Sequence, residues 1–150
     1  MRVAVGTLDL RRGRNRLAAT VVLGHAVKHV YNSGLLALLL PKIKIGLGLN
    51  AARYGTLVSA RHATSWGTTL GAGYMGDRFS NRAGEMMGAS MVLIGVAFLV
   101  MGYASGYPIM LVALLLAGVG PALYHPPALG ELSRRFPDRR GFAISLHGTG

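Results

Sequence analysis

The sequence predicts an all-α membrane protein, and three observations support this fold class. Long apolar runs alternate with short basic segments, 51% of the 150 residues are hydrophobic, and the mean hydropathy is +0.42. Uninterrupted apolar runs of about 18 residues or more are typical of membrane-spanning helices. Glycine contributes 22 residues, which suits helices that approach one another closely in lipid.

The first apolar stretch, residues 17–40, predicts a helix longer than a hydrocarbon core of about 30 Å, at a rise of about 1.5 Å per residue. Residues 1–16 before it form a basic tail with five arginines and one acid, Asp9. We expect Pro41 to end this helix, because proline lacks the N–H that the next turn would use. Residues 42–53 then form a loop rich in glycine and lysine.

Further apolar segments complete a partial bundle of four helices and the start of a fifth. The second segment is the most polar, and Arg61 within it requires protein or water rather than lipid as its neighbour. The fourth begins at Tyr107–Pro108 and holds Pro121, Pro126 and Pro127 in its interior, so we expect a kink or local unwinding there. The expected helices are residues 17–40, 54–76, 86–104, 107–130 and 141–150, the last of them cut off by the end of the sequence.

Charge defines the orientation. The net charge is +11, a balance that nucleic-acid binders also show. Here the charges lie between the apolar runs, as they do in cytoplasmic loops, so we predict no nucleic-acid partner. With the N-terminus in the cytoplasm, ten basic residues fall in inside segments and three in the outside loop, which the positive-inside rule favours. A secretory signal fits the N-terminus poorly, and an organellar transit peptide has only the arginines in its favour.

A polar loop after the second helix is the most specific feature. Its residues are Gly73, Gly76, Asp77, Arg78 and Arg82. Glycines permit close packing where two helices turn, and carboxylate and guanidinium groups pair with charges on neighbouring helices. Such a loop can hold one conformational state of a bundle as a gate, and Glu131 or Asp138 would be partners for its arginines. A solvated charged turn is the simpler alternative.

This loop resembles the signature of the major facilitator superfamily, which reads roughly G-x-x-x-D-R-x-G-R-R between helices two and three. Four positions match, while Ser80 and Asn81 stand where a glycine and a basic residue are usual. The resemblance implies a twelve-helix bundle of two six-helix halves that exposes a central site to each side in turn. This chain would supply most of the first half, and the remaining helices would be its partners.

A finer resemblance is to the fosmidomycin-resistance-type subgroup of that superfamily. The residues that carry it are His25, Leu40–Pro41, Gly118–Val119–Gly120, His125–Pro126, Arg140–Gly141, Ser145 and Gly148. The subgroup implies a drug or metabolite exporter of the bacterial inner membrane.

A polar stripe marks the first helix. His25, Lys28, His29 and Asn32 have offsets of 0, 3, 4 and 7 and fall within one arc of about 100°. Ionisable groups at membrane depth are costly and are functional by default. Histidine exchanges protons near neutral pH, and a lysine can hold an anionic substrate group. The alternative is that Lys28 snorkels and the histidines bond locally.

Two further residues extend this predicted path for substrate and protons. Arg61 offers five donors suited to carboxylate or phosphate, although snorkelling competes, and His125 sits beside the Pro126–Pro127 step. A zinc site at His25 and His29 lacks a nearby acid or cysteine, so we predict neither a metal nor a cofactor. The predicted path consists of His25, Lys28, His29, Asn32, Arg61 and His125.

The predicted function is secondary transport of a small organic molecule across the lipid bilayer, with proton coupling and efflux. The chain carries no phosphate-binding loop, dinucleotide fingerprint or nucleophile elbow, so we predict that it is not an enzyme. The alternative is a non-transporting membrane subunit, or a truncated fragment that acts only through helix–helix interaction.

Overall fold

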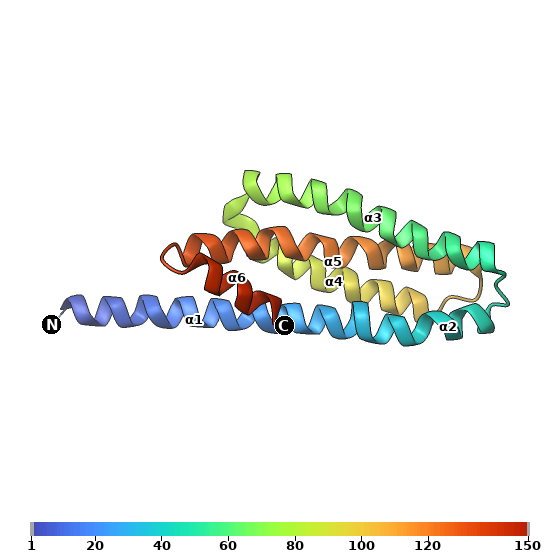
Figure 1. The fold of residues 1–150 in the computed structure, drawn as a ribbon, viewed down its shortest axis with the longest axis horizontal. Coiled ribbons are helices and arrows are strands. Elements are labelled where there is room, and N and C mark those ends of the chain that lie inside the picture. The colour runs from blue at the N-terminus through green and yellow to red at the C-terminus, as the bar shows by residue number, and fades with distance from the viewer. Residues whose placement is uncertain (1, 150) are drawn as a thin grey trace.

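The computed structural model describes the backbone of residues 2–149 and the side chains of residues 13–149 (Figure 1). These residues form helices and no strand, which confirms the predicted all-α class. The elements are α1 (Arg2–His29), the π-helix η1 (Val30–Leu35), α2 (Leu36–Gly46), α3 (Ala51–Arg78), the 3-10 helix η2 (Ser80–Arg82), α4 (Ala83–Gly102), α5 (Tyr107–Arg135) and α6 (Arg140–Gly148).

The first helix is longer than its apolar stretch. In Figure 1, α1, η1 and α2 form one continuous rod, and Pro41 lies inside α2. The expectation that Pro41 ends the helix was therefore wrong. A proline deletes one helical hydrogen bond without preventing the turns on either side, and Pro41 is exposed, so its ring meets no packed neighbour. The rod ends at Leu47, before Gly48 with its φ of 58°, a backbone conformation that suits glycine.

Helix α3 begins with a side-chain cap. The Asn50 Oδ1 atom accepts a hydrogen bond from the Arg53 backbone N–H at 2.9 Å. Such caps satisfy one of the free N–H groups at a helix start. The cap explains why α3 begins at Ala51, three residues before the apolar segment.

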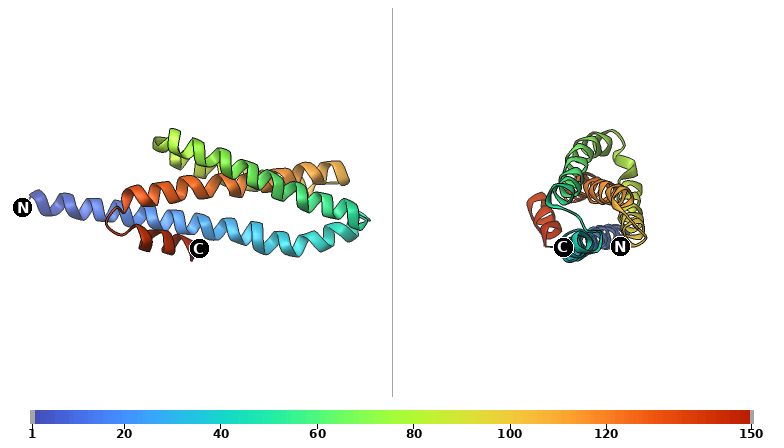
Figure 2. Two further views of the ribbon diagram at one scale, coloured as in Figure 1. Left: turned by 45° about the horizontal axis from the view of Figure 1, so that its top comes forward. Right: turned by 90° about the vertical axis from the view of Figure 1, so that its right-hand side faces the viewer.

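Helix α5 is the centre of the bundle and packs most extensively against α3 and α4. Figure 2 shows it beside both of them. It runs as one α-helix through Pro121, Pro126 and Pro127, so the expected local unwinding is not found. Pro121 and Pro127 are buried, and neighbouring helices can hold a proline-containing turn in helical form.

Glycines on α5 allow its close neighbours to approach. A Cβ atom on Gly118 would collide with the Arg61 carbonyl and Thr64 hydroxyl of α3. Two residues further on, and so on the opposite face, Gly120 packs against Ile94, and its carbonyl accepts a hydrogen bond from the Ser90 hydroxyl of α4 at 2.6 Å. The backbone of α5 thus touches both partners directly, as is common between membrane helices.

Two helices among the described residues are long and apolar enough to cross a membrane, namely Ser80–Gly102 and Tyr107–Arg135. The expected spans over residues 17–40 and 54–76 do not meet that measure. The π turn η1 divides the first stretch into the end of α1, a helix that begins with several arginines, and the 11-residue α2. The second carries charged side chains such as Arg61 within α3.

The close approach of α5 and α3 makes a direct prediction. We expect Gly118→Ala to lower the free energy of unfolding by about 1–3 kcal/mol, the usual cost of forcing extra volume into a packed interior. Gly67→Ala on α3, where a Cβ meets nothing within 4 Å, is the matched control. Thermal unfolding in detergent should show a lower midpoint for the first variant alone, and equal midpoints would contradict this account of the packing.

Candidate functional site

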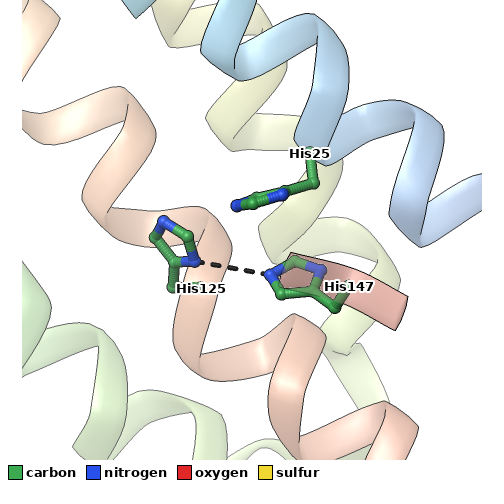
Figure 3. A group of neighbouring side chains, drawn as sticks. All are labelled: His25, His125 and His147. Carbon is green, nitrogen blue, oxygen red and sulfur yellow. Dashed lines mark hydrogen bonds between the residues drawn. The ribbon is translucent and has the colours of Figure 1, made fainter. Parts of the chain in front are cut away.

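Three histidines from three helices meet inside the bundle (Figure 3). His25 belongs to α1, His125 to α5 and His147 to α6. The ring centroids of His25 and His147 are 4.0 Å apart, and those of His25 and His125 are 5.0 Å apart. The third pair, His125 and His147, is separated by 5.6 Å. Sequence positions far apart therefore form one cluster, which we call the histidine cluster.

Lys28 joins this cluster from α1. Its side chain is buried, and its Nζ atom lies 2.5 Å from the Nε2 atom of His125. A lysine ammonium group has no lone pair and can only donate, so the histidine nitrogen accepts. The contact ties α1 to α5 through two polar groups, of which the lysine is buried and the histidine is half-buried.

His29 lies at the edge of the cluster. Its Nε2 atom is 3.1 Å from the Nε2 atom of His25, one turn away on α1. Its Nδ1 atom is 3.2 Å from the Ser33 hydroxyl, one turn further on. His29 itself is exposed, so it connects the buried histidines to the surface of the bundle.

The π turn divides the polar stripe of the first helix. Asn32 lies in η1 and accepts a hydrogen bond from the Arg61 guanidinium group of α3 at 2.8 Å. Lys28 contacts α5 instead. A π turn adds a residue to one helical turn and often occurs at functional sites. The structure thus brings all six residues of the predicted path into two contacting groups, one around His125 and one around Arg61.

Tyr124 of α5 packs against the histidine cluster. Its hydroxyl donates a hydrogen bond to the Val21 carbonyl of α1 at 2.7 Å. Its ring stacks on both His25 and His147, with centroids 6.3 and 6.2 Å apart. On the facing helix, Gly24 leaves room for the hydroxyl, since a Cβ there would collide with it. The tyrosine therefore fixes α1 against α5 beside the histidines.

The sequence reasoning missed His147. It lies close to the end of the sequence, where the predicted fifth helix is short and shows little periodicity. The usable signal was the spacing of Ala143 and His147, which are four residues apart and both buried on α6. A histidine on the same face as a buried alanine indicates an inward position.

Acidic residues are scarce in the sequence on either side of His25 and His125. Residues 10–76 and 86–130 contain neither aspartate nor glutamate. Of the acids with described side chains, Asp77 and Glu85 are exposed, while Asp138 and Glu131 pair with arginines. Buried Lys28 and half-buried Arg61 therefore have no carboxylate counter-charge among the residues whose side chains the structure describes.

The predicted gating loop lies where α3 turns into α4. Gly76 is buried against the backbone of the Pro126–Pro127 step, while Asp77, Arg78 and Arg82 are exposed. Within the part of the chain whose side chains are described, these three charged residues form no ion pair.

The expected partners of this loop are engaged elsewhere. Glu131 pairs with Arg134 at 2.7 Å and with Arg135 at 2.9 Å, both on its own helix. Asp138 pairs with Arg14 at 3.3 Å. The expectation that these two acids pair with Arg78 and Arg82 was therefore wrong, because arginines one helical turn from Glu131 reach it first.

Another arginine bridges the same end of the bundle. Arg134 of α5 donates to the Ser80 carbonyl of η2 at 3.1 Å while it is held by Glu131. A cleft of about 530 Å³ opens beside these residues. At this end of the bundle, Arg134 thus links α5 to η2 through a backbone carbonyl. The charged side chains of the loop take no part in this contact.

Comparison with known proteins decides the family. The model of the major facilitator superfamily matches residues 26–150. This chain belongs to the major facilitator superfamily. It is consequently part of an integral membrane protein, and its helices are those of the N-terminal portion of that fold.

The curated relatives that this chain matches are much longer than the chain itself. It is 32% identical over 108 residues to the oxalate:formate antiporter of Oxalobacter formigenes, which covers 72% of this chain and 25% of the relative. It is 33% identical over 88 residues to the efflux pump terG of Aspergillus terreus, which covers 53% of this chain and 17% of the relative. The chain thus spans about a quarter or less of these relatives. No solved structure matches significantly.

A third relative is an uncharacterized MFS-type transporter of Mycobacterium tuberculosis, 37% identical over 81 residues, which covers 53% of this chain and 14% of the relative. The fosmidomycin-resistance-type subgroup stays a prediction.

The support that Tyr124 gives to the cluster can be measured. We expect Tyr124→Phe to lower the free energy of unfolding by about 1 kcal/mol, because a buried hydroxyl bond of ordinary strength is lost. Tyr103→Phe is the matched control, since Tyr103 is 84% exposed. Denaturation in detergent, followed by circular dichroism, should separate the two variants. If both variants unfold like the unmodified protein, the hydrogen bond of the Tyr124 hydroxyl does not contribute to stability.

Proposed function

We propose that this chain forms part of a secondary transporter that moves a small organic molecule through the polar interior between α1, α3, α5 and α6. The observation that carries this proposal is the cluster of buried Lys28, buried His25 and His147, and half-buried His125 inside a major facilitator bundle. Polar groups at membrane depth are costly and mark substrate or ion pathways. The antiporter and efflux names of two relatives support the same function.

Proton coupling is the second part of the proposal. Histidine is the side chain that changes charge most readily near neutral pH. His29 is exposed and lies within hydrogen-bond distance of buried His25, so a proton has a stepwise route from the surface inward. We propose that this route links substrate movement to the proton gradient, with export as its direction.

The loop of Asp77, Arg78 and Arg82 is proposed to act as the gate. Alternating access requires contacts that form in one state and break in the other. These three charged residues are exposed beside a helix-to-helix turn. Their availability supports a role in contacts with other helices, which would stabilise one of the two access states.

The alternative function, a non-transporting membrane subunit, rests on α3. Trp66, Leu70 and Tyr74 repeat every fourth residue on this helix and are 77%, 80% and 72% exposed. Such a face suits helix–helix association. It predicts a bound partner and no substrate movement, so a transport assay separates the two functions.

The proposed location is a bacterial inner membrane, with the N-terminus in the cytoplasm. These 150 residues contain no cysteine, so a cysteine introduced among them can report on sidedness once any cysteine elsewhere in the protein has been replaced. We expect Asn81→Cys in intact cells to resist a membrane-impermeant maleimide and Lys42→Cys to react with it, because the basic loops favour the inside. The reverse labelling pattern would overturn this orientation.

Transport in proteoliposomes tests the proposed path and gate. We expect His25→Ala and Asp77→Ala, made in the protein expressed from its complete reading frame, each to slow transport about tenfold or more, as a loss of about 1.4 kcal/mol would do. His62→Ala and Glu85→Ala are matched controls, because both side chains are exposed on α3 and α4.

A panel of organic anions, neutral compounds and cations serves as the set of substrates. Unchanged transport in both test variants, with correctly assembled protein, would remove these residues from the path and the gate.

A further inference from the structure

We infer that the histidine cluster is an oxyanion site, and that the carboxylate group of a small organic acid binds at the Nδ1 edges of His25 and His147. This inference rests on the proposed transport function and specifies the class of substrate. It follows from the direction of the hydrogen bonds, from the unpaired nitrogen atoms and from the charge of the cluster.

The direction of the bonds is set by Lys28. The ammonium group donates to the Nε2 atom of His125, so the proton of this neutral imidazole lies on Nδ1. That Nδ1 atom is 3.4 Å from the Nε2 atom of His147. His147 therefore accepts at Nε2, and its own N–H group is at Nδ1. One buried lysine thus orders the protons of two histidines.

This order leaves a donor without an acceptor. The Nδ1 atom of His147 is buried and has no hydrogen-bond partner, and the same is true of the Nδ1 atom of His25. The two residues are only 3% and 5% exposed. A buried N–H group without an acceptor is costly, so the geometry indicates that an acceptor is missing. The centroids of the two rings are 4.0 Å apart, so the rings touch and the carboxylate binds at their edges, where one of its oxygens accepts from the N–H at Nδ1 of His147.

The charge of the bundle interior is positive, and this also favours a bound anion. Lys28 and Arg61 are buried or half-buried cations, and the sequence offers no acid in residues 10–76 or 86–130 to neutralise them. The Nε atom of Arg61 is a further buried donor without a partner. A buried cation needs a counter-charge, and a bound carboxylate supplies it.

A metal ion is the competing occupant. His25, His125 and His147 each place a possible ligand nitrogen within 4.8 Å of the others, and imidazole is a common zinc ligand. The ammonium group of Lys28 touches His125, however, and would repel a divalent cation. Metal-bound histidines usually donate their other nitrogen to a carboxylate or carbonyl, whereas His125 faces a lysine. The cluster therefore favours an anion.

Ligand-dependent thermal stability of the detergent-purified protein, from its complete reading frame, tests this inference without a transport measurement. The probes are acetate and succinate, compared with acetamide and succinamide at constant ionic strength. A ligand that binds only the folded state raises the unfolding midpoint. We expect the two acids to raise it and the two amides to leave it unchanged. Equal effects of acids and amides, or no effect of either acid, would overturn the inference.

Two variants of one residue test the donor atom. The amide of His147→Asn places an N–H near the position of Nδ1, while that of His147→Gln places it near Nε2. We expect the Asn variant to retain the acid-dependent stabilisation and the Gln variant to weaken binding about tenfold or more, equivalent to a loss of about 1.4 kcal/mol. His62→Gln, on an exposed position of α3, is the matched control and should bind as the unmodified protein does.

Zinc chloride is the third probe. Stabilisation by micromolar zinc that is lost in His25→Gln, His125→Gln and His147→Gln alike would replace the anion site with a metal site. Failure of the inference and failure of the proposed function remain distinct. Acid binding without any transport would refute only the transporter, and transport restricted to neutral or cationic compounds would refute only the anion site.

Discussion

The contact between Lys28 and His125 determines the character of the bundle interior. It joins the first helix to the central one through a buried lysine and a half-buried histidine, and no salt bridge neutralises the lysine among the side chains that the structure describes. A hydrophobic pair would hold the helices together at lower cost. Retaining an ammonium group there makes the interior cationic and orients the neighbouring imidazoles, which an entirely apolar interface cannot do.

The backbone of α5 holds the helix that carries His125 in place. Gly118 and Gly120 bring α3 and α4 against α5 with little side chain between them, so these three helices form a close-packed unit. The α1 rod touches this unit through apolar clusters that include Val21 and Leu36, and between these through Tyr124 and the histidine cluster. Polar contacts depend on charge and hydration more than apolar ones do. The arrangement therefore places the adaptable interface on the side of the bundle where the ionisable groups lie.

Much of this architecture could be predicted from the sequence, and the failures have physical causes. Hydropathy identified the helices, and a 100° periodicity identified the inward face with His25 and Lys28. Pro41 was misread as a stop, because the true end depends on the positive φ of Gly48. The π turn redirected Asn32 toward Arg61, and regular periodicity cannot foresee an extra residue in one turn. His147 was missed because its inward position arises from tertiary packing of a short helix.

The end of α3 that leads into the charged loop packs against α5, the helix that carries His125, and this gives a physical route between the loop and the histidine cluster. Gly76, next to Asp77, packs against the backbone of the Pro126–Pro127 step, and His125 directly precedes that step. A shift of α3 against α5 at the loop would therefore act on the turn that presents His125 to Lys28. Proline-containing turns lack backbone hydrogen bonds and deform more easily than regular ones. The Pro126–Pro127 step therefore couples the packing of the loop to the contact between His125 and Lys28.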